Sequence, residues 1–205
     1  AVPPLPGLNI DVSQTSVSGI SSGGFMTVQF QVAHSSIVKG AGVIAGGPYN
    51  CSQGDVLRAL TQCSCTGEPA VSCKVTPASA NVPALAADAQ ALADKGLIDP
   101  TSNLSKQRIL TVSGAKDTLV PPTIADQLSA FYTALGVPAS SVSPVRLADA
   151  AQCGDGSLLA RLAHRGSLIA HRSRAARAAP RRVSRGGGCS RSPLVRLAAA
   201  ARHRR

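Results

Sequence analysis

The chain has 205 residues and a formal net charge of +11, with no Trp and only three Phe and two Tyr. This length suffices for one α/β domain, whose core must consist mainly of Val, Leu, Ile and Ala. No run of about eighteen apolar residues occurs in the sequence, so we predict no membrane span.

The charge is distributed unevenly between two parts of the chain. Residues 1–151 hold eight Lys and Arg against nine Asp and Glu, whereas residues 152–205 hold thirteen Arg, one acidic residue and no aromatic residue. We therefore predict a folded domain at 1–151, and at 152–205 an Arg-rich tail that is disordered or aberrant.

The first predicted strand covers residues 12–17 and leads directly into the most informative motif, Gly19-Ile20-Ser21-Ser22-Gly23. Gly-x-Ser-x-Gly is typical of a nucleophile elbow, a strained turn from strand to helix that exposes a serine hydroxyl. We expect glycine at 19 and 23 because a Cβ at either position would clash with the strand or the helix. Ser21 is thus the predicted nucleophile, and the backbone N–H of Ser22 is the predicted oxyanion donor at the helix N-terminus. The alternative is an ordinary Gly/Ser loop.

Further elements follow in an alternating order that is typical of a mostly parallel sheet. After a buried helix from about residue 25 to 33, we predict strands at 40–47, 108–114 and 142–147 and helices at 82–95 and 123–135. The segment from 51 to about 80 has little periodicity and is expected to cross over the site.

Four cysteines lie within this crossing segment, at Cys51, Cys63, Cys65 and Cys73. They favour disulfides formed in an oxidising compartment, and all three pairings stay open. A zinc site is the alternative, but the segment has neither a Cys-x-x-Cys motif nor a nearby histidine. The chain begins with Ala1-Val2 and has no basic-then-apolar leader, as expected of a mature secreted protein.

Asp117 follows the strand predicted at 108–114, at the sheet edge where open α/β sheets carry functional groups. The order Ser21 then Asp117 matches the triad order of α/β-hydrolases, in which the acidic residue orients a histidine. The alternative for Asp117 is a turn or helix cap before Pro121. Because only eighteen residues precede the elbow, we predict an α/β-hydrolase-like, mostly parallel sheet that is circularly permuted and incomplete.

Two sequence blocks, residues 17–26 and 42–51, resemble extracellular poly(3-hydroxybutyrate) depolymerases, above all the single-domain, circularly permuted type. Residues 113–120 resemble the segment that carries the triad aspartate of that family, and the likeness covers about residues 5–151. The resemblance implies a secreted serine esterase that acts on polyester, oligoester or short-chain ester substrates as a monomer, without metal or organic cofactor. It also implies Ser21 as nucleophile, Ser22 as oxyanion donor and Asp117 as the residue that orients a histidine.

The family's histidine is expected just after the strand at 142–147, but the chain reads Asp149-Ala150-Ala151-Gln152-Cys153 there. His34 precedes Asp117, and the histidines at 164, 171 and 203 lie in the Arg-rich tail, so we assign no triad histidine. Three interpretations of the tail stay open: a product of translation out of frame after Ala151, a disordered segment, or a basic arm. The last gives the alternative function, a non-enzymatic protein that binds nucleic acid or another polyanion through its arginines.

Overall fold

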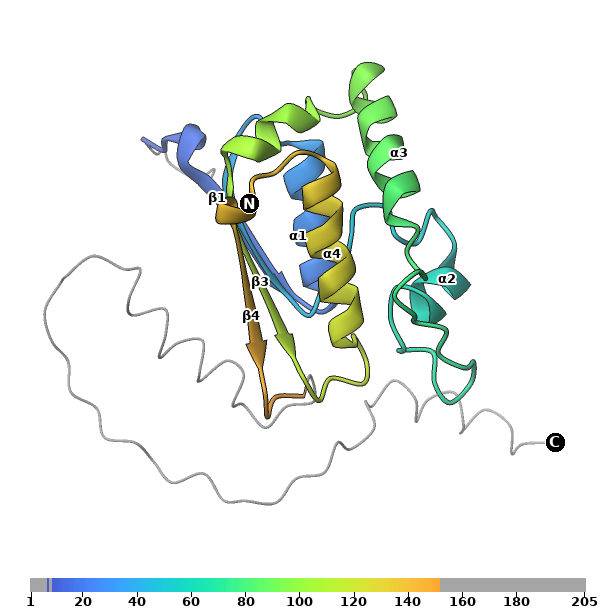
Figure 1. Ribbon diagram of the computed structural model, residues 1–205. Coiled ribbons are helices and arrows are strands. Elements are labelled where there is room, and N and C mark those ends of the chain that lie inside the picture. Colours follow the sequence, from blue (N-terminus) through green and yellow to red (C-terminus); the bar gives the residue numbers. More distant parts are fainter. Residues whose placement is uncertain (1–6, 8, 152–205) are drawn as a thin grey trace, which may run out of the picture. The chain divides into compact units, whose positions relative to one another are not determined.

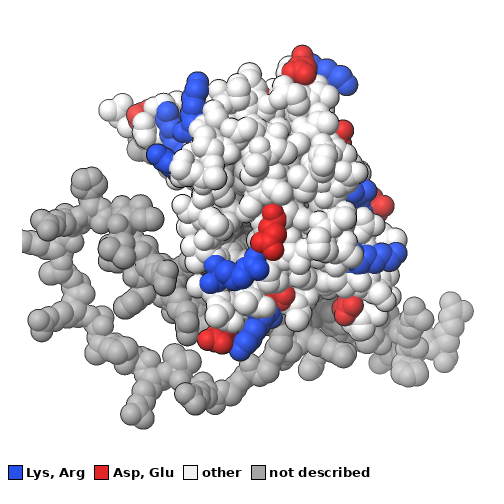
Figure 2. All heavy atoms as spheres, viewed as in Figure 1, with Lys and Arg blue, Asp and Glu red and all other residues white. Residues whose placement is uncertain are grey.

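The structure, a computed structural model, describes residue 7 and residues 9–151. The predicted tail and its three histidines lie outside these residues, so the predictions about its disorder, its origin and its binding of polyanions stay predictions. On the face shown in Figure 2, the described residues present few basic or acidic side chains, and most of their surface is uncharged.

Four strands form one fully parallel sheet in the order β1-β2-β3-β4. They are β1 (Thr15–Ile20), β2 (Val38–Ile44), β3 (Arg108–Gly114) and β4 (Val142–Leu147). The sequence predicts the last two strands with these bounds. The strand predicted at 12–17 instead begins at Thr15, because Asp11 accepts hydrogen bonds from Ser13 and starts a 3-10 turn at Val12–Gln14.

Helices connect the strands, and those packed on the sheet lie on one face of it (Figure 1). Helix α1 (Ser22–Ala33) packs against β1 and β2, and α4 (Pro122–Ala134) packs against β3 and β4. Helix α3 (Val82–Asp94) packs on α4, and the side chain of Asn81 accepts a hydrogen bond from Ala84 N–H, as expected of its N-cap. The short α2 (Val56–Thr61) and the 3-10 helices Thr101–Lys106 and Ala139–Ser141 complete the described elements.

The core lies between the sheet and this helix layer. Its fully buried side chains include Val28 of α1, Ile109 of β3 and Phe131 of α4. Gln31 joins two layers inside this core, because its Nε2 donates to Gln107 and its Oε1 accepts from the Tyr132 hydroxyl. Burial raises the pKa of Tyr132, so this hydroxyl stays protonated and remains a donor.

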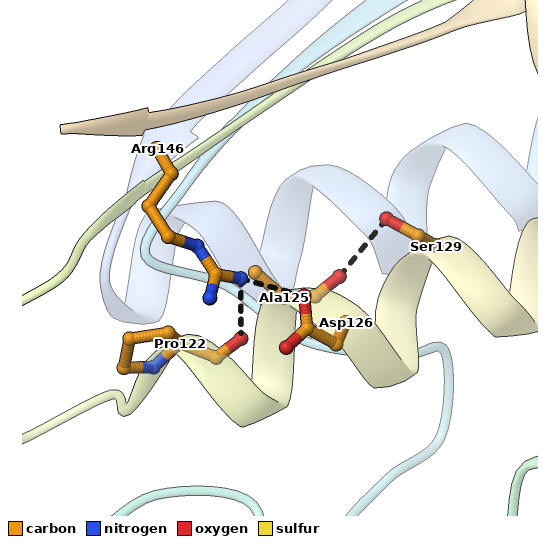
Figure 3. A network of polar contacts seen from close by, with 5 residues as sticks. All are labelled: Pro122, Ala125, Asp126, Ser129 and Arg146. Atoms are coloured by element: carbon orange, nitrogen blue, oxygen red, sulfur yellow. Dashed lines mark hydrogen bonds and ion pairs between the residues drawn. The ribbon is translucent and has the colours of Figure 1, made fainter.

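An ion pair fixes the last strand to the helix layer (Figure 3). Arg146 of β4 donates from Nη2 to the Asp126 carboxylate at 2.6 Å and to the Pro122 carbonyl oxygen at 3.5 Å, both in α4. Because both charged side chains are about half exposed or more, at 47% and 66%, the pair positions β4 more than it stabilises the fold.

Candidate active site

Ser21 lies in the sharp turn between β1 and α1, with backbone angles φ 57° and ψ −124° that L-residues rarely adopt. Its N–H donates to the Ile44 carbonyl at 2.9 Å, which holds the turn against the end of β2. Although Ser21 is the N-cap of α1, its side chain makes no capping hydrogen bond. The turn therefore has the strained backbone of the predicted nucleophile elbow, and the hydroxyl is not used by the helix.

The glycines of the motif have different roles, and the prediction for one of them was wrong. A Cβ on Gly19 would collide with the backbone carbonyl of Gly23, as expected. A Cβ on Gly23 would meet no atom within 4 Å. The second tight position is Gly24 instead, where a Cβ would lie 2.7 Å from the Ile44 carbonyl oxygen. The Gly23 backbone therefore lies against Gly19, but the side-chain direction of Gly23 is open, and the positions that leave no room for a Cβ are Gly19 and Gly24.

Ser22 is the first residue of α1, so its backbone N–H has no acceptor inside the helix. The positive end of the helix dipole lies at the same place. Ser22 and Ser21 line one pocket, of about 360 Å³. An oxygen that becomes negative next to Ser21 could therefore accept a hydrogen bond from Ser22 N–H.

The pocket has a mostly apolar wall in which the crossing segment takes part, as its sequence position predicts. α1 contributes Phe25, Met26 and Gln29, and the crossing segment contributes Ala59 and Leu60 among others. Two disulfides, Cys51–Cys63 and Cys65–Cys73, link this segment, and Cys51 and Cys63 also line the pocket. A larger hollow of about 700 Å³ lies between α3 and α4, but no Ser, Cys or His is among its described lining residues.

Asp117 follows β3 at the same edge of the sheet at which Ser21 follows β1, because all the strands are parallel. The side chain is buried, with 4% of its residue exposed, and its Oδ1 accepts from the N–H groups of Leu119 and Val120 at 2.9 and 2.8 Å. Burial raises the pKa of the Asp117 carboxyl, and these two hydrogen bonds oppose the shift. Val120 belongs to the wall of the Ser21 pocket, so the Asp117 turn borders that pocket.

Both interpretations of Asp117 are compatible with this geometry. Its Oδ1 caps the turn before α4, whereas Oδ2 accepts no hydrogen bond from any residue between 9 and 151. The segment after β4 closes over the same loop, since the Ala150 carbonyl accepts from Lys116 N–H at 3.0 Å. A histidine placed just after β4 would therefore be near Asp117, but Asp149, Ala150 and Ala151 occupy that stretch.

His34 is the histidine that the structure describes. It is the C-cap residue of α1, at the opposite end of the helix from Ser21, and it is exposed. Ser21 and His34 flank the twelve residues of α1 and are about 20 Å apart along its axis, so His34 cannot reach the Ser21 hydroxyl. Among the described residues, no group of three His, Cys, Asp or Glu side chains is arranged to hold a metal ion. No helix in residues 9–151 is both long enough and apolar enough to cross a membrane.

Sequence reasoning did not identify Gln29 or Leu60 as pocket residues. It also left open how the cysteines that line the pocket are paired. Gln29 follows Ser22 by seven residues on α1, which is two helical turns and thus the same face of the helix. That spacing is the signal that could have located it. Leu60 lies on the short helix α2, which has no such signal.

Comparison with known proteins gives two curated relatives. Poly(3-hydroxybutyrate) depolymerase of Delftia acidovorans is 41% identical over 139 residues, which are 67% of this chain and 26% of that protein. Polyhydroxybutyrate depolymerase of Talaromyces funiculosus is 35% identical over 127 residues, which are 62% of this chain and 33% of that protein. This chain therefore spans about a quarter to a third of the length of these relatives. No protein-family model matches it.

Solved structures agree with these relatives. The crystal structure of PHB depolymerase from Penicillium funiculosum has 30% identity and a TM-score of 0.56, covering 72% of this chain and 42% of that chain. A PHB depolymerase complexed with R3HB trimer has 29% identity, the same TM-score and the same coverage. Together with the parallel sheet, this confirms the predicted α/β-hydrolase-like fold. Circular permutation stays a prediction.

Proposed function

Because the chain belongs to the poly(3-hydroxybutyrate) depolymerase family, we propose that it hydrolyses ester bonds of poly(3-hydroxybutyrate)-type polyesters as a serine esterase. The observation that carries this proposal is the Ser21 turn. It combines a backbone with positive φ, a hydroxyl that caps nothing and the free Ser22 N–H in one apolar pocket. These are the elements that acyl transfer to a serine requires.

In the proposed reaction, the Ser21 hydroxyl oxygen attacks the ester carbonyl carbon and loses its proton to a base. The carbonyl oxygen becomes an oxyanion that accepts a hydrogen bond from Ser22 N–H. When the oxyanion collapses, the ester C–O bond breaks, and the alcohol leaves with the proton from the protonated base. Water then attacks the acyl-Ser21 ester in the same way, which releases the acid and restores the serine.

Asp117 would orient and stabilise the histidine that acts as this base, through the Oδ2 that the turn does not use. No histidine between residues 9 and 151 can take this place, so the proposal requires a base from outside the described residues. We also propose that the protein is secreted and acts as a monomer. Two disulfides among the described residues support secretion, because such bonds persist in oxidising compartments.

The test compares the 205-residue chain with its Ser21→Ala variant, using a short-chain chromogenic ester and a fluorophosphonate label. We expect hydrolysis and labelling by the chain, and loss of both in Ser21→Ala, with unchanged circular dichroism. Labelling without turnover would show a reactive Ser21 and would contradict ester hydrolysis as the activity of this chain. Equal inertness of both proteins toward both reagents would contradict the proposal.

A further inference from the structure

Gln29 shares a pocket with Ser21 but lies at some distance from the reacting atoms. It follows Ser22 by two turns of α1, which is about 10 Å along the helix axis, and Met26 lies between them on the same side. The pocket thus extends from the nucleophile along one face of this helix. The Cα positions of Ser22 and Gln29 are far enough apart for the two residues to contact different ester units of one chain.

The orientation of the Gln29 amide is determined by a backbone donor. Asn50 N–H donates to Gln29 Oε1 at 3.2 Å, and only the amide oxygen can accept that bond. Nε2 is therefore the other branch of the amide. It donates to no residue in the described part, and it is not among the buried side-chain atoms that lack a partner. Gln29 thus has an N–H donor that solvent or a ligand can reach.

The residues that line the pocket determine which ligands the Gln29 N–H donor can bind. Large pocket neighbours are apolar, namely Phe25, Met26, Leu60 and Val120, together with the Cys51–Cys63 disulfide. Among the hydroxyl groups that line the pocket, that of Ser64 donates to the Ala59 carbonyl at 2.7 Å and lies 2.8 Å from the Thr66 hydroxyl. An amide N–H in an apolar wall favours a ligand that is apolar except for hydrogen-bond acceptors. Ester chains with small alkyl branches have this chemistry, because each unit offers a carbonyl acceptor and no donor.

We propose that Gln29 forms a subsite that binds the carbonyl of a neighbouring ester unit, while the ester to be cleaved lies at Ser21. The identity of the ligand as an oligoester rests on the proposed function. Gln29 then distinguishes oligoesters from simple esters, because only a chain of several units has a second carbonyl within reach. Its Nε2 donates to the substrate and its Oε1 holds Asn50, whose positive φ of 53° requires support.

The experiment measures binding of a linear (R)-3-hydroxybutyrate trimer to the full chain by calorimetry, in the Ser21→Ala background so that nothing is hydrolysed. Gln29→Glu is the informative variant, because a carboxylate still accepts the Asn50 N–H but cannot donate at neutral pH. Gln29→Met removes both hydrogen bonds. We expect Gln29→Glu to weaken trimer binding about tenfold or more, as the loss of one buried hydrogen bond implies.

A monomeric control, methyl 3-hydroxybutyrate, should bind equally to the Ser21→Ala chain with and without the Gln29→Glu substitution. The subsite would be overturned if Gln29→Glu bound the trimer as tightly as the parent chain does. It would also be overturned if trimer binding were weakened only in Gln29→Met, and the amide would then have a structural role. Absence of trimer binding to Ser21→Ala would overturn it as well. Trimer binding that depends on Gln29 in a chain without esterase activity would support the subsite while contradicting the proposed function.

Discussion

Asp117 uses its two carboxylate oxygens differently. Oδ1 accepts two backbone N–H groups and so shapes the loop, whereas Oδ2 is the oxygen that could hold an imidazole. An asparagine keeps the first interaction and has no charge to desolvate. An alanine loses the first interaction as well. The two substitutions therefore separate the structural role of Asp117 from its electrostatic role.

We expect Asp117→Asn to be as stable as the parent chain or more stable at pH 7. We expect Asp117→Ala to lose about 1–3 kcal/mol of unfolding free energy, because two backbone donors lose their acceptor. Urea unfolding followed by circular dichroism measures both. A loss in Asp117→Asn as large as in Asp117→Ala would show that the charge itself stabilises the loop.

The pH dependence of stability follows from the same carboxyl group. Burial raises the pKa of Asp117 in the folded chain above its ordinary value near 3.8, so the folded state takes up a proton at higher pH than the unfolded state. The contribution of Asp117 to stability therefore increases as pH falls from neutral through the raised pKa, and levels off below the unfolded value. This contribution should be absent from the pH profile of Asp117→Asn.

At the scale of elements, the approach of β1 to α1 determines the shape of the elbow. Gly19→Ala should destabilise the chain by about 1–3 kcal/mol or more, because its methyl group would overlap the Gly23 carbonyl and the backbone would have to move. The matched control is Gly23→Ala, which meets no atom within 4 Å and lies in a helix that favours alanine. Thermal unfolding of both variants checks this, and equal destabilisation would contradict the close approach.

The elements differ in how far the sequence predicts them. β3 and β4 are short segments that contain Val, Ile or Leu at several positions and have polar or small residues on both sides, and their bounds are predicted to the residue. α2 escapes prediction because it has six residues, and the Asp55 side chain and two nearby disulfides hold it in place. The pairing of the cysteines depends on Cα separations of 6.0 and 4.7 Å, which a sequence does not contain.

The candidate site shows the same division. Ser21 and Asp117 follow predicted strands of one parallel sheet, so their placement at one edge follows from the sequence. Gln29 belongs to no motif, and its role depends on Asn50, which a turn after β2 brings next to it. A hydrogen bond between residues on different elements has no signature in sequence spacing.

At the scale of the whole molecule, handedness explains why the described helices occupy one side of the sheet. Each connection from β1 to β4 moves one strand in the same direction, and right-handed crossovers then place every connecting helix on the same face. The opposite face contains the row of register partners Ile20, Ile44, Val112 and Val145. No helix among residues 9–151 packs on this row (Figure 1).

Two isoleucines on opposite faces of the sheet, one in β1 and one in β3, test this asymmetry. Ile109 faces the helix layer and is 2% exposed, whereas Ile20 faces the other way and is 38% exposed. We expect Ile109→Ala to cost about 2–5 kcal/mol of unfolding free energy, as truncation of a buried aliphatic side chain does. Ile20→Ala should cost less than about 1 kcal/mol, since the methyl groups that it removes are already partly in water. Urea unfolding of the full chain measures both, and equal losses would mean that Ile20 is buried in solution and that its face of the sheet is covered.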